Sequence, residues 1–200
     1  MRGRTVFHAV KPLLMAAIGV MRLCPRPVCS LLLVLCRYVP TKVGMAARYV
    51  LVARLARSCG GNVAISEGVH FFRLEGLSVG NNVSIHPMCY IDCTGGLRIG
   101  SDVSIAHAVT IMTTNHDYGR AGVMIRDAEC VRSEVCIADD VWIGAGARIL
   151  AGHSIGTHVV VGAGAVVTSD IPSGSVAAGV PARVIKKISK ERSYETARSF

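Results

Sequence analysis

The sequence predicts an all-β domain, a parallel β-helix of stacked triangular coils, preceded by an apolar and basic helical segment. Three observations support this prediction. Aliphatic residues recur every six positions between residues 79 and 167, the 200 residues include 21 glycines but only ten aromatic residues, and the positive charge lies in the N-terminal third. An apolar content of 51% is too high for a disordered chain. Short aliphatic side chains between glycines favour many short strands with tight corners.

The six-residue period has one slip and one long interruption. A helix repeats every 3.6 residues and a plain strand every two, so neither produces this period. A chain that turns a corner every six residues does produce it. Three segments then close a triangular coil of about 18 residues, and stacked coils bury the aliphatic column. We expect the slip at residues 93–96 to be a two-residue bulge at one corner. The predicted core column contains Val79, Ile85, Ile91, Ile99, Ile105, Ile111, Ile137, Ile143, Ile149, Ile155, Val161 and Val167.

Residues 1–60 are the predicted helical segment. Two apolar runs, residues 12–21 and 28–36, are separated by Pro25 and Pro27. Proline lacks a backbone N–H and restricts the residue before it, so these two prolines prevent one continuous helix. Each run is also shorter than the roughly 20 residues that a helix needs to cross a bilayer.

The charge of this segment predicts a membrane contact. Residues 1–66 contain ten lysines and arginines and no acid, whereas residues 67–200 contain twelve bases and thirteen acids, so nucleic acid is not an expected partner. We expect residues 1–58 to contact an anionic membrane surface, at the cytoplasmic face. The alternative is that these helices pack on the next domain or on another subunit. Residues 43–58 are predicted to form an amphipathic helix that gathers on one face Arg48, Arg54 and Arg57.

The eight cysteines indicate a reducing compartment. No two of them are separated by two residues, which is the spacing typical of a zinc ribbon. Scattered thiols without such spacing are typical of a cytoplasmic protein.

Several segments within the repeat resemble a known family: VWIG at 141–144, VGAG at 161–164, VT at 167–168 and AAGVPARVI at 177–185. Over residues 61–185 the chain resembles the hexapeptide-repeat O-acetyltransferases, in the branch of galactoside, maltose and polysaccharide acetyltransferases. The resemblance implies a left-handed β-helix, acetyl-CoA as co-substrate, no metal, and a homotrimer with active sites between subunits. Residues 186–200 would form a C-terminal tail.

A polar loop at residues 112–136 interrupts the repeat. A long polar excursion from a regular coil is usually functional. The resemblance implies that His116 in this loop is the catalytic base, with Asn115 or Asp117 fixing its tautomer. Imidazole, with an ordinary pKa of about 6.5, can accept a hydroxyl proton as the oxygen attacks a thioester carbonyl.

The resemblance also implies binding residues. Acetyl-CoA would lie along the groove between coils, with backbone N–H groups near Gly144 and Ala145 stabilising the oxyanion. The implied co-substrate residues are Trp142, Gly144, Ala145, Ala163, Thr168, Ser169 and Arg183. The acceptor would be a sugar or glycan precursor, preferably lipid-linked, bound by His86, Asp92 and Tyr118.

Four alternatives remain open from the sequence. The chain could acetylate an amine of an amino sugar, or the hydroxyl of serine. It could be a zinc enzyme similar to the β-helical carbonic anhydrases, with His153 and His158 joined by His116 or His107 as ligands. It could be a trimeric scaffold without activity, although a scaffold has no need of the loop. Cys130 could act as a covalent nucleophile.

Overall fold

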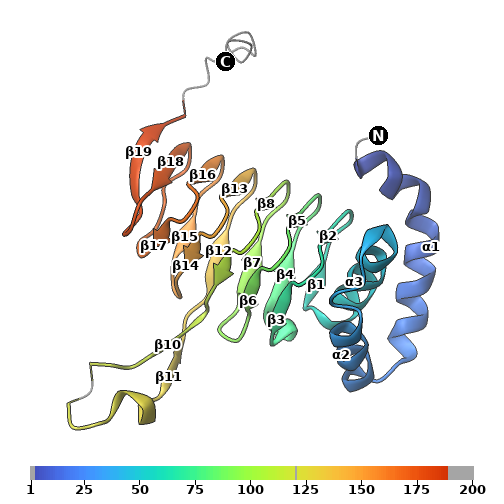
Figure 1. The fold of residues 1–200 in the computed structure, drawn as a ribbon, viewed down its shortest axis with the longest axis horizontal. Coiled ribbons are helices and arrows are strands. Elements are labelled where there is room, and N and C mark those ends of the chain that lie inside the picture. Colours follow the sequence, from blue (N-terminus) through green and yellow to red (C-terminus); the bar gives the residue numbers. More distant parts are fainter. Residues whose placement is uncertain (1–2, 120, 189–200) are drawn as a thin grey trace.

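The computed structural model describes residues 3–119 and 121–188, which form a helical cap and a left-handed parallel β-helix (Figure 1). Helices α1 (Gly3–Leu23), α2 (Arg26–Leu35) and α3 (Thr41–Leu55) cover one end of the β-helical prism. The break between α1 and α2 falls at Cys24 and Pro25, which confirms the prediction from the two prolines.

Three parallel sheets form the sides of the prism, and each full coil contributes one strand to every sheet. The first sheet contains β1 (Ser58–Cys59), β4 (Leu77–Val79), β7 (Leu97–Ile99), β12 (Val135–Ile137) and β15 (Ser154–Ile155). The second contains β2 (Ala64–Ile65), β5 (Ser84–Ile85), β8 (Ser104–Ile105), β13 (Val141–Ile143), β16 (Val159–Val161) and β18 (Ser175–Ala178), with β19 (Arg183–Lys187) added antiparallel. The third contains β3 (His70–Phe72), β6 (Tyr90–Asp92), β9 (Thr110–Ile111), β14 (Arg148–Ile149) and β17 (Val166–Val167).

The interior of the prism is the predicted aliphatic column. All twelve residues of that column are buried, with exposed fractions of 4% or less. Removing one such side chain from water stabilises the fold by about 1.5–3 kcal/mol. The six-residue period therefore predicted which side chains point into the prism and fill its core.

One corner of the prism differs from the other two. Ser58 pairs with Ser78, which gives a 20-residue coil, whereas Val141 pairs with Val159, which gives an 18-residue coil. The two additional residues lie where the chain passes from the third sheet to the first, at residues 73–76 and 93–96. The first of these positions holds a short 3-10 helix, η1 (Leu74–Gly76).

The same corner, two coils beyond η1, carries the interrupting loop. We call the column of residues 73–76, 93–96 and 112–134 the arm corner. Strands β10 (Thr114–His116) and β11 (Cys130–Arg132) pair antiparallel and, with η2 (Ile125–Asp127), form a hairpin arm that extends away from the prism (Figure 1). At its base the Ser133 N–H donates to the Thr113 carbonyl at 2.9 Å, so the coil closes beneath the arm.

Helix α3 is not the amphipathic surface helix that the sequence predicts. It lies between the prism and the other two helices, contacting α1, α2 and β2. Residues around its whole circumference are therefore buried, including Tyr49, Val50, Leu51 and Val52. Arg48, predicted on one face of the helix with Arg54 and Arg57, is only 1% exposed. The prediction failed because the apolar residues of α3 are spread around the helix rather than gathered on one face, a distribution typical of a helix buried on all sides.

Three arginines satisfy the carbonyl groups at the C-terminal ends of the three helices. Arg54 donates to carbonyls at the end of α1, and Arg48 donates to the carbonyls of Cys36 and Val39 just beyond α2. Arg26 donates to the Leu55 carbonyl at the end of α3. Carbonyl groups in the last turn have no partner within the helix, and the helix dipole favours cations there. Part of the basic charge therefore holds the cap together.

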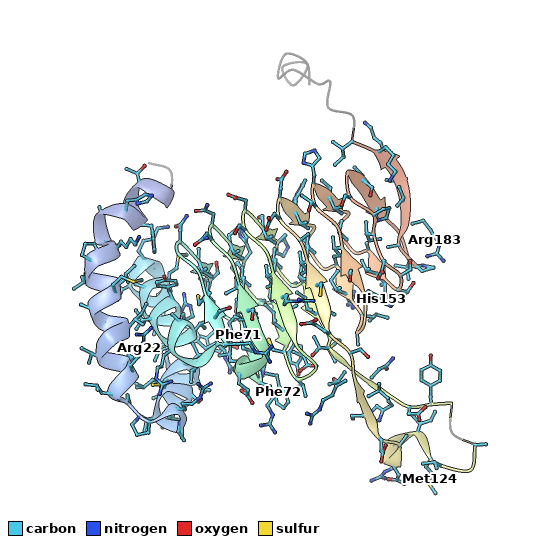
Figure 2. The ribbon with its side chains drawn as sticks, turned by 180° about the vertical axis from the view of Figure 1, so that it is seen from behind. Arg22, Phe71, Phe72, Met124, His153 and Arg183 are labelled. Atoms are coloured by element: carbon cyan, nitrogen blue, oxygen red, sulfur yellow. The ribbon has the colours of Figure 1, made fainter. Side chains whose placement is uncertain are left out.

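Within the described residues, 3–119 and 121–188, no helix combines the length and apolarity required to span a bilayer. The outer helices nevertheless expose large apolar side chains, the most exposed of which are Leu13, Val20, Leu23, Leu31 and Leu35. Figure 2 shows Arg22 on α1, at the end of the molecule opposite Arg183.

Candidate active site

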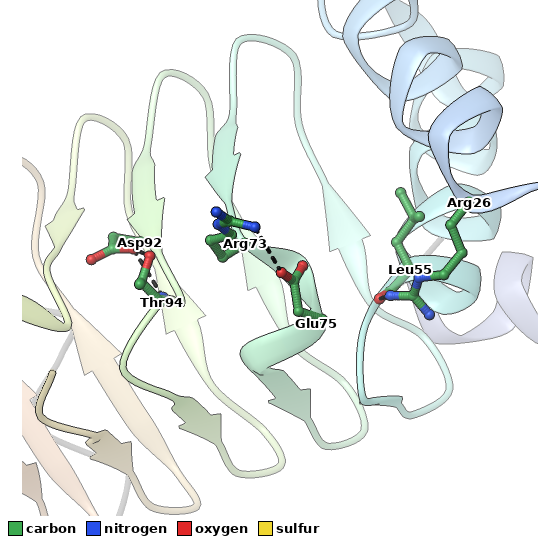
Figure 3. A network of polar contacts seen from close by, with 6 residues as sticks. All are labelled: Arg26, Leu55, Arg73, Glu75, Asp92 and Thr94. Carbon is green, nitrogen blue, oxygen red and sulfur yellow. Dashed lines mark hydrogen bonds and ion pairs between the residues drawn. The ribbon is translucent and has the colours of Figure 1, made fainter.

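A buried carboxylate anchors the arm to the prism. Asp92, at the end of β6, is 3% exposed, and its oxygens accept hydrogen bonds from both the N–H and hydroxyl of Thr94. They also accept from the N–H and hydroxyl of Thr113 and from the hydroxyl of Thr114, at 2.9–3.2 Å. Figure 3 shows the Asp92–Thr94 contact at the turn. Asp92 therefore ties the corner of one coil to the first residues of the arm in the next.

The environment of Asp92 stabilises its charged form. Burial alone would raise the pKa of this carboxyl group, but the hydrogen bonds from Thr94, Thr114 and Thr113 outweigh it and hold the pKa below its ordinary value. An ionised carboxylate accepts hydrogen bonds at both oxygens, which suits a position surrounded by hydroxyl and amide donors.

His116 lies on β10 with its ring turned toward the other half of the arm. Its Nδ1 is 3.3 Å from the carbonyl oxygen of Ala128. Because a carbonyl can only accept, Nδ1 carries the proton in this contact and the Nε2 lone pair is free to accept another. The side chain is exposed, so an incoming hydroxyl can reach Nε2.

The ring partner differs from the two predicted residues. The side-chain oxygen of Asn115 accepts the backbone N–H of His116 at 3.2 Å, and that of Asp117 accepts the Gly119 N–H at 3.3 Å. Both side chains shape the backbone of the arm, and the Ala128 carbonyl orients the imidazole in their place. A backbone acceptor supplied by tertiary pairing has no signature in the sequence.

The predicted co-substrate residues begin on β13. Trp142 points outward from the second sheet, between Ser104 and Val160 of the neighbouring strands, and is 55% exposed. Its ring is available as an apolar surface for a ligand or a neighbouring subunit.

Gly144 and Ala145 form the corner that follows β13. The Gly144 N–H donates to the Val161 carbonyl at 2.8 Å within the coil stack, so it is not available as the predicted oxyanion donor. A Cβ at Gly144 would lie 2.5 Å from the Ala163 amide nitrogen, which explains why glycine occupies this position. The carbonyl of Ala145 accepts the N–H of Gly164 at 2.8 Å.

The remaining predicted residues lie on the later coils. Ala163 is exposed at the same corner one coil beyond Ala145, whereas Thr168 and Ser169 are exposed after β17, on the side of the arm corner. Arg183, exposed on β19, donates to the carbonyl of its neighbour Ala182 at 2.8 Å. Figure 2 shows Arg183 at the C-terminal end of the prism, far from the arm tip at Met124.

The predicted acceptor residues do not share one corner. We call the corner between the second and third sheets the second corner; it holds residues 86–89, 106–109, 144–147 and 162–165. His86 is exposed there, in the column of Gly144, while Asp92 lies at the arm corner and Tyr118 stands 75% exposed on the arm. A single chain therefore divides the predicted site between two edges of the third sheet.

The histidines proposed as zinc ligands have separate partners. His153 Nδ1 is 3.7 Å from an Asp170 oxygen, and His158 Nδ1 is 2.6 Å from an Asp140 oxygen. Among the residues that the structure describes, no group of three or more histidine, cysteine, aspartate or glutamate side chains is placed to hold a metal ion.

Two features near the site were not predicted. Register pairs His116 with Cys130, and neighbouring ladder bonds make this a non-hydrogen-bonded pair, whose side chains lie closest across an antiparallel ladder. On the third sheet, the rings of His70 and Tyr90 stack at 5.2 Å with an interplanar angle of 2°. The six-residue period leaves the register of the arm undefined, and His70 lies before the first residue of the periodic series, Val79.

No protein-family model matches the chain. Among individual proteins, galactoside O-acetyltransferase of Escherichia coli (strain K12) is 33% identical over 141 residues, which cover 70% of this chain and 68% of the relative.

Solved structures give a consistent result. The crystal structure of a maltose O-acetyltransferase from Clostridium difficile 630 matches with a TM-score of 0.70 at 31% identity, covering 85% of this chain and 89% of that one. A galactoside acetyltransferase in complex with coenzyme A matches with a TM-score of 0.64 at 28% identity, covering 82% of this chain and 80% of that one.

Proposed function

This chain belongs to the hexapeptide-repeat acetyltransferase family, and we propose that it transfers acetyl from acetyl-CoA to a hydroxyl group of a sugar or glycan precursor. The observation that carries the chemistry is the geometry of His116. Its Nδ1 faces the Ala128 carbonyl, so the opposite nitrogen is the basic one, and it lies on an exposed arm. This is the tautomer that a general base for an incoming hydroxyl requires.

The proposed reaction is a direct transfer. Nε2 of His116 accepts the hydroxyl proton while the oxygen attacks the carbonyl carbon of the thioester. The resulting oxyanion collapses, the carbon–sulfur bond breaks, and the leaving thiolate takes the proton from the imidazolium. The products are the acetyl ester and coenzyme A, with no acyl-enzyme. Since the Gly144 N–H is engaged in the coil, the N–H of Ala145 is the proposed oxyanion donor at this corner.

We propose a homotrimer in which the arm of one subunit reaches the second corner of its neighbour. The arm leaves the prism of its own chain (Figure 1), whereas Ala145 and Ala163 lie at the second corner and Trp142 faces outward from β13. The arm also exposes the apolar side chains of Met124 and Ile125, at 72% and 63%. A neighbouring subunit would cover this apolar surface and bring the base to the co-substrate. Three equivalent sites would result.

The proposed acceptor is lipid-linked, and the proposed location is the cytoplasmic face of a membrane. Helices α1 and α2 expose several large apolar side chains, and no acid occurs in the first 66 residues. Apolar area and basic charge together favour an anionic lipid surface. Because the hydrogen bonds of Arg48 and Arg54 serve the helix ends, the charge offered to lipid comes from the other bases of the segment.

The test is an acceptor screen with radiolabelled acetyl-CoA across free sugars, nucleotide sugars, polyprenyl-linked sugars, amino sugars and serine. We expect an alkali-labile ester on a sugar hydroxyl, formed fastest with the polyprenyl-linked acceptor. An alkali-stable amide on an amino sugar would contradict O-transfer, and a label confined to serine would contradict the sugar acceptor.

A further inference from the structure

A basic notch lies between α2 and the first coil of the prism. It has a volume of about 220 Å³, and Arg26, Arg37 and Arg73 line it together with Ser30. Its remaining walls are apolar residues of α2, α3 and the first coil. Three arginines thus line one concave surface outside the active site described above.

The notch carries more positive charge than its internal pairs neutralise. Among the described residues that line it, Glu75 is the single acid, and it pairs with Arg73 at 3.6 Å (Figure 3). Both partners of that pair are well exposed, at 64% and 59%, so the pair is weak and easily exchanged. Arg26 uses one N–H for the Leu55 carbonyl, which leaves further donors of its planar fork.

Electrostatic effects on a neighbouring histidine agree with this excess charge. Burial lowers the pKa of His70, and the positive charge of Arg37 lowers it further. Guanidinium groups bind the oxygens of phosphate with paired hydrogen bonds, and they do so better than ammonium groups because the fork is planar. A phosphate group is therefore the ligand that suits a notch lined by three arginines and a serine.

The source of the phosphate follows from the neighbouring surface. Val34 lines the notch and is also 52% exposed, and it adjoins the exposed apolar ridge formed by Leu31 and Leu35 on the same helix. A helix that lies in a bilayer interface buries its apolar ridge among acyl chains and holds its cationic side chains at the level of the headgroups. α2 presents both surfaces side by side.

We propose that this notch binds the phosphate group of an anionic membrane lipid. The proposal defines the membrane contact suggested above and rests on the proposed function only for its relation to the acceptor. Arg73 and Glu75 stand at the arm corner, two coils from the base of the arm, and coils are spaced about 4.8 Å apart. A lipid phosphate in the notch would therefore lie roughly 10 Å along the prism from the arm base.

The test measures flotation of the full-length protein with phosphatidylcholine vesicles, with and without phosphatidylglycerol, in the absence of acetyl-CoA. The double variant Arg37→Gln/Arg73→Gln is expected to weaken binding to the anionic vesicles about 25-fold, because the loss of each arginine weakens binding about fivefold. The matched control Lys11→Gln/Lys42→Gln removes the same charge from exposed positions of α1 and α3 and should weaken binding much less. Glu75→Gln, which releases Arg73, should strengthen it.

Three results would overturn the proposal. Equal losses in the two double variants would show diffuse electrostatic attraction without a site. Unchanged vesicle binding of both Glu75→Gln and Arg73→Gln would also show that there is no specific site. If the double variant fails to fold, the single variant Arg73→Gln, altered at an exposed side chain, takes its place. Arginine-dependent binding of soluble glycerol phosphate as tight as that of vesicles would indicate a soluble phosphorylated ligand. Since the flotation assay measures no acetyl transfer, its result can be interpreted even if the protein shows no acetyltransferase activity.

Discussion

The prism and the helical cap satisfy their buried backbone groups by different means. In the prism, each strand donates to and accepts from the strands of neighbouring coils, as in the bonds from Ser84 to Val103 and from Tyr90 to Val109. In the cap, the free carbonyls at the helix ends are satisfied by guanidinium groups from other helices. The prism therefore distributes its polar contacts over many equivalent bonds, whereas the cap concentrates them on three side chains.

The difference has a consequence for how each region tolerates substitution. A lost contact in the prism is one among many in a repeating ladder, while a lost arginine in the cap removes several hydrogen bonds at once. A buried polar group without a partner costs about 1–3 kcal/mol. The cap is thus expected to be sensitive at a few charged positions and tolerant elsewhere.

The largest expected effect on stability is that of Arg48→Met. Arg48 donates to the carbonyls of Ile65, Cys36 and Val39, so the substitution removes three hydrogen bonds, among them the buried one to Ile65. We expect a loss of about 3–5 kcal/mol in the free energy of unfolding, measured by urea denaturation. The exposed Arg57 provides the control, because Arg57→Met should change stability by no more than about 0.5 kcal/mol. Equal stabilities of the two variants would refute the role of Arg48.

Two glycine substitutions are expected to change stability in opposite directions, one in the prism and one in the cap. Gly144→Ala in the prism would place a Cβ 2.5 Å from the Ala163 nitrogen, so we expect a loss of about 1–3 kcal/mol. Gly19→Ala in α1 meets no atom within 4 Å and should stabilise the helix by about 0.5–1 kcal/mol. Thermal unfolding of both variants measures the contrast. A stabilising Gly144→Ala would show that the corner is looser than the stacked coils require.

The anchor of the arm predicts a smaller, pH-dependent effect. The pKa of Asp92 in the folded protein is lowered, so its contribution to stability is present above the unfolded-state pKa of about 3.9 and is lost as the pH falls through the lower folded-state value. Asp92→Asn should cost about 1–2 kcal/mol at neutral pH and should flatten the acid limb of a stability-against-pH curve. An unchanged acid limb in this variant would contradict the role given to the ionised carboxylate.

The sequence predicted the parts of the molecule that follow local or periodic rules. The six-residue period gave the buried column from Val79 to Val167, and Pro25 with Pro27 gave the break between α1 and α2. Periodicity works here because each coil repeats the environment of the one before. The resemblance to acetyltransferases supplied the hand of the coil, which a period alone cannot give.

The features that escaped prediction all depend on non-local partners. Arg48 has the charge of a surface residue, and only the packing of α3 between two layers shows that it is buried. The orientation of His116 depends on the Ala128 carbonyl, a backbone group that any residue could provide. The engagement of the Gly144 N–H follows from the pairing of Ile143 with Val161, one coil further along the chain. Such contacts need coordinates, because residue identity does not specify them.

The most direct test of the proposed mechanism is the rate of acetyl transfer by a His116→Ala variant, with acetyl-CoA affinity and trimer formation measured in parallel. We predict that turnover falls about 100- to 10,000-fold while co-substrate binding and assembly persist, and that Cys130→Ala, altered at the facing position of the arm, keeps its turnover. Near-normal turnover of His116→Ala would contradict a general-base role for the imidazole, and so would near-normal turnover of His116→Ala combined with loss of activity in Cys130→Ala.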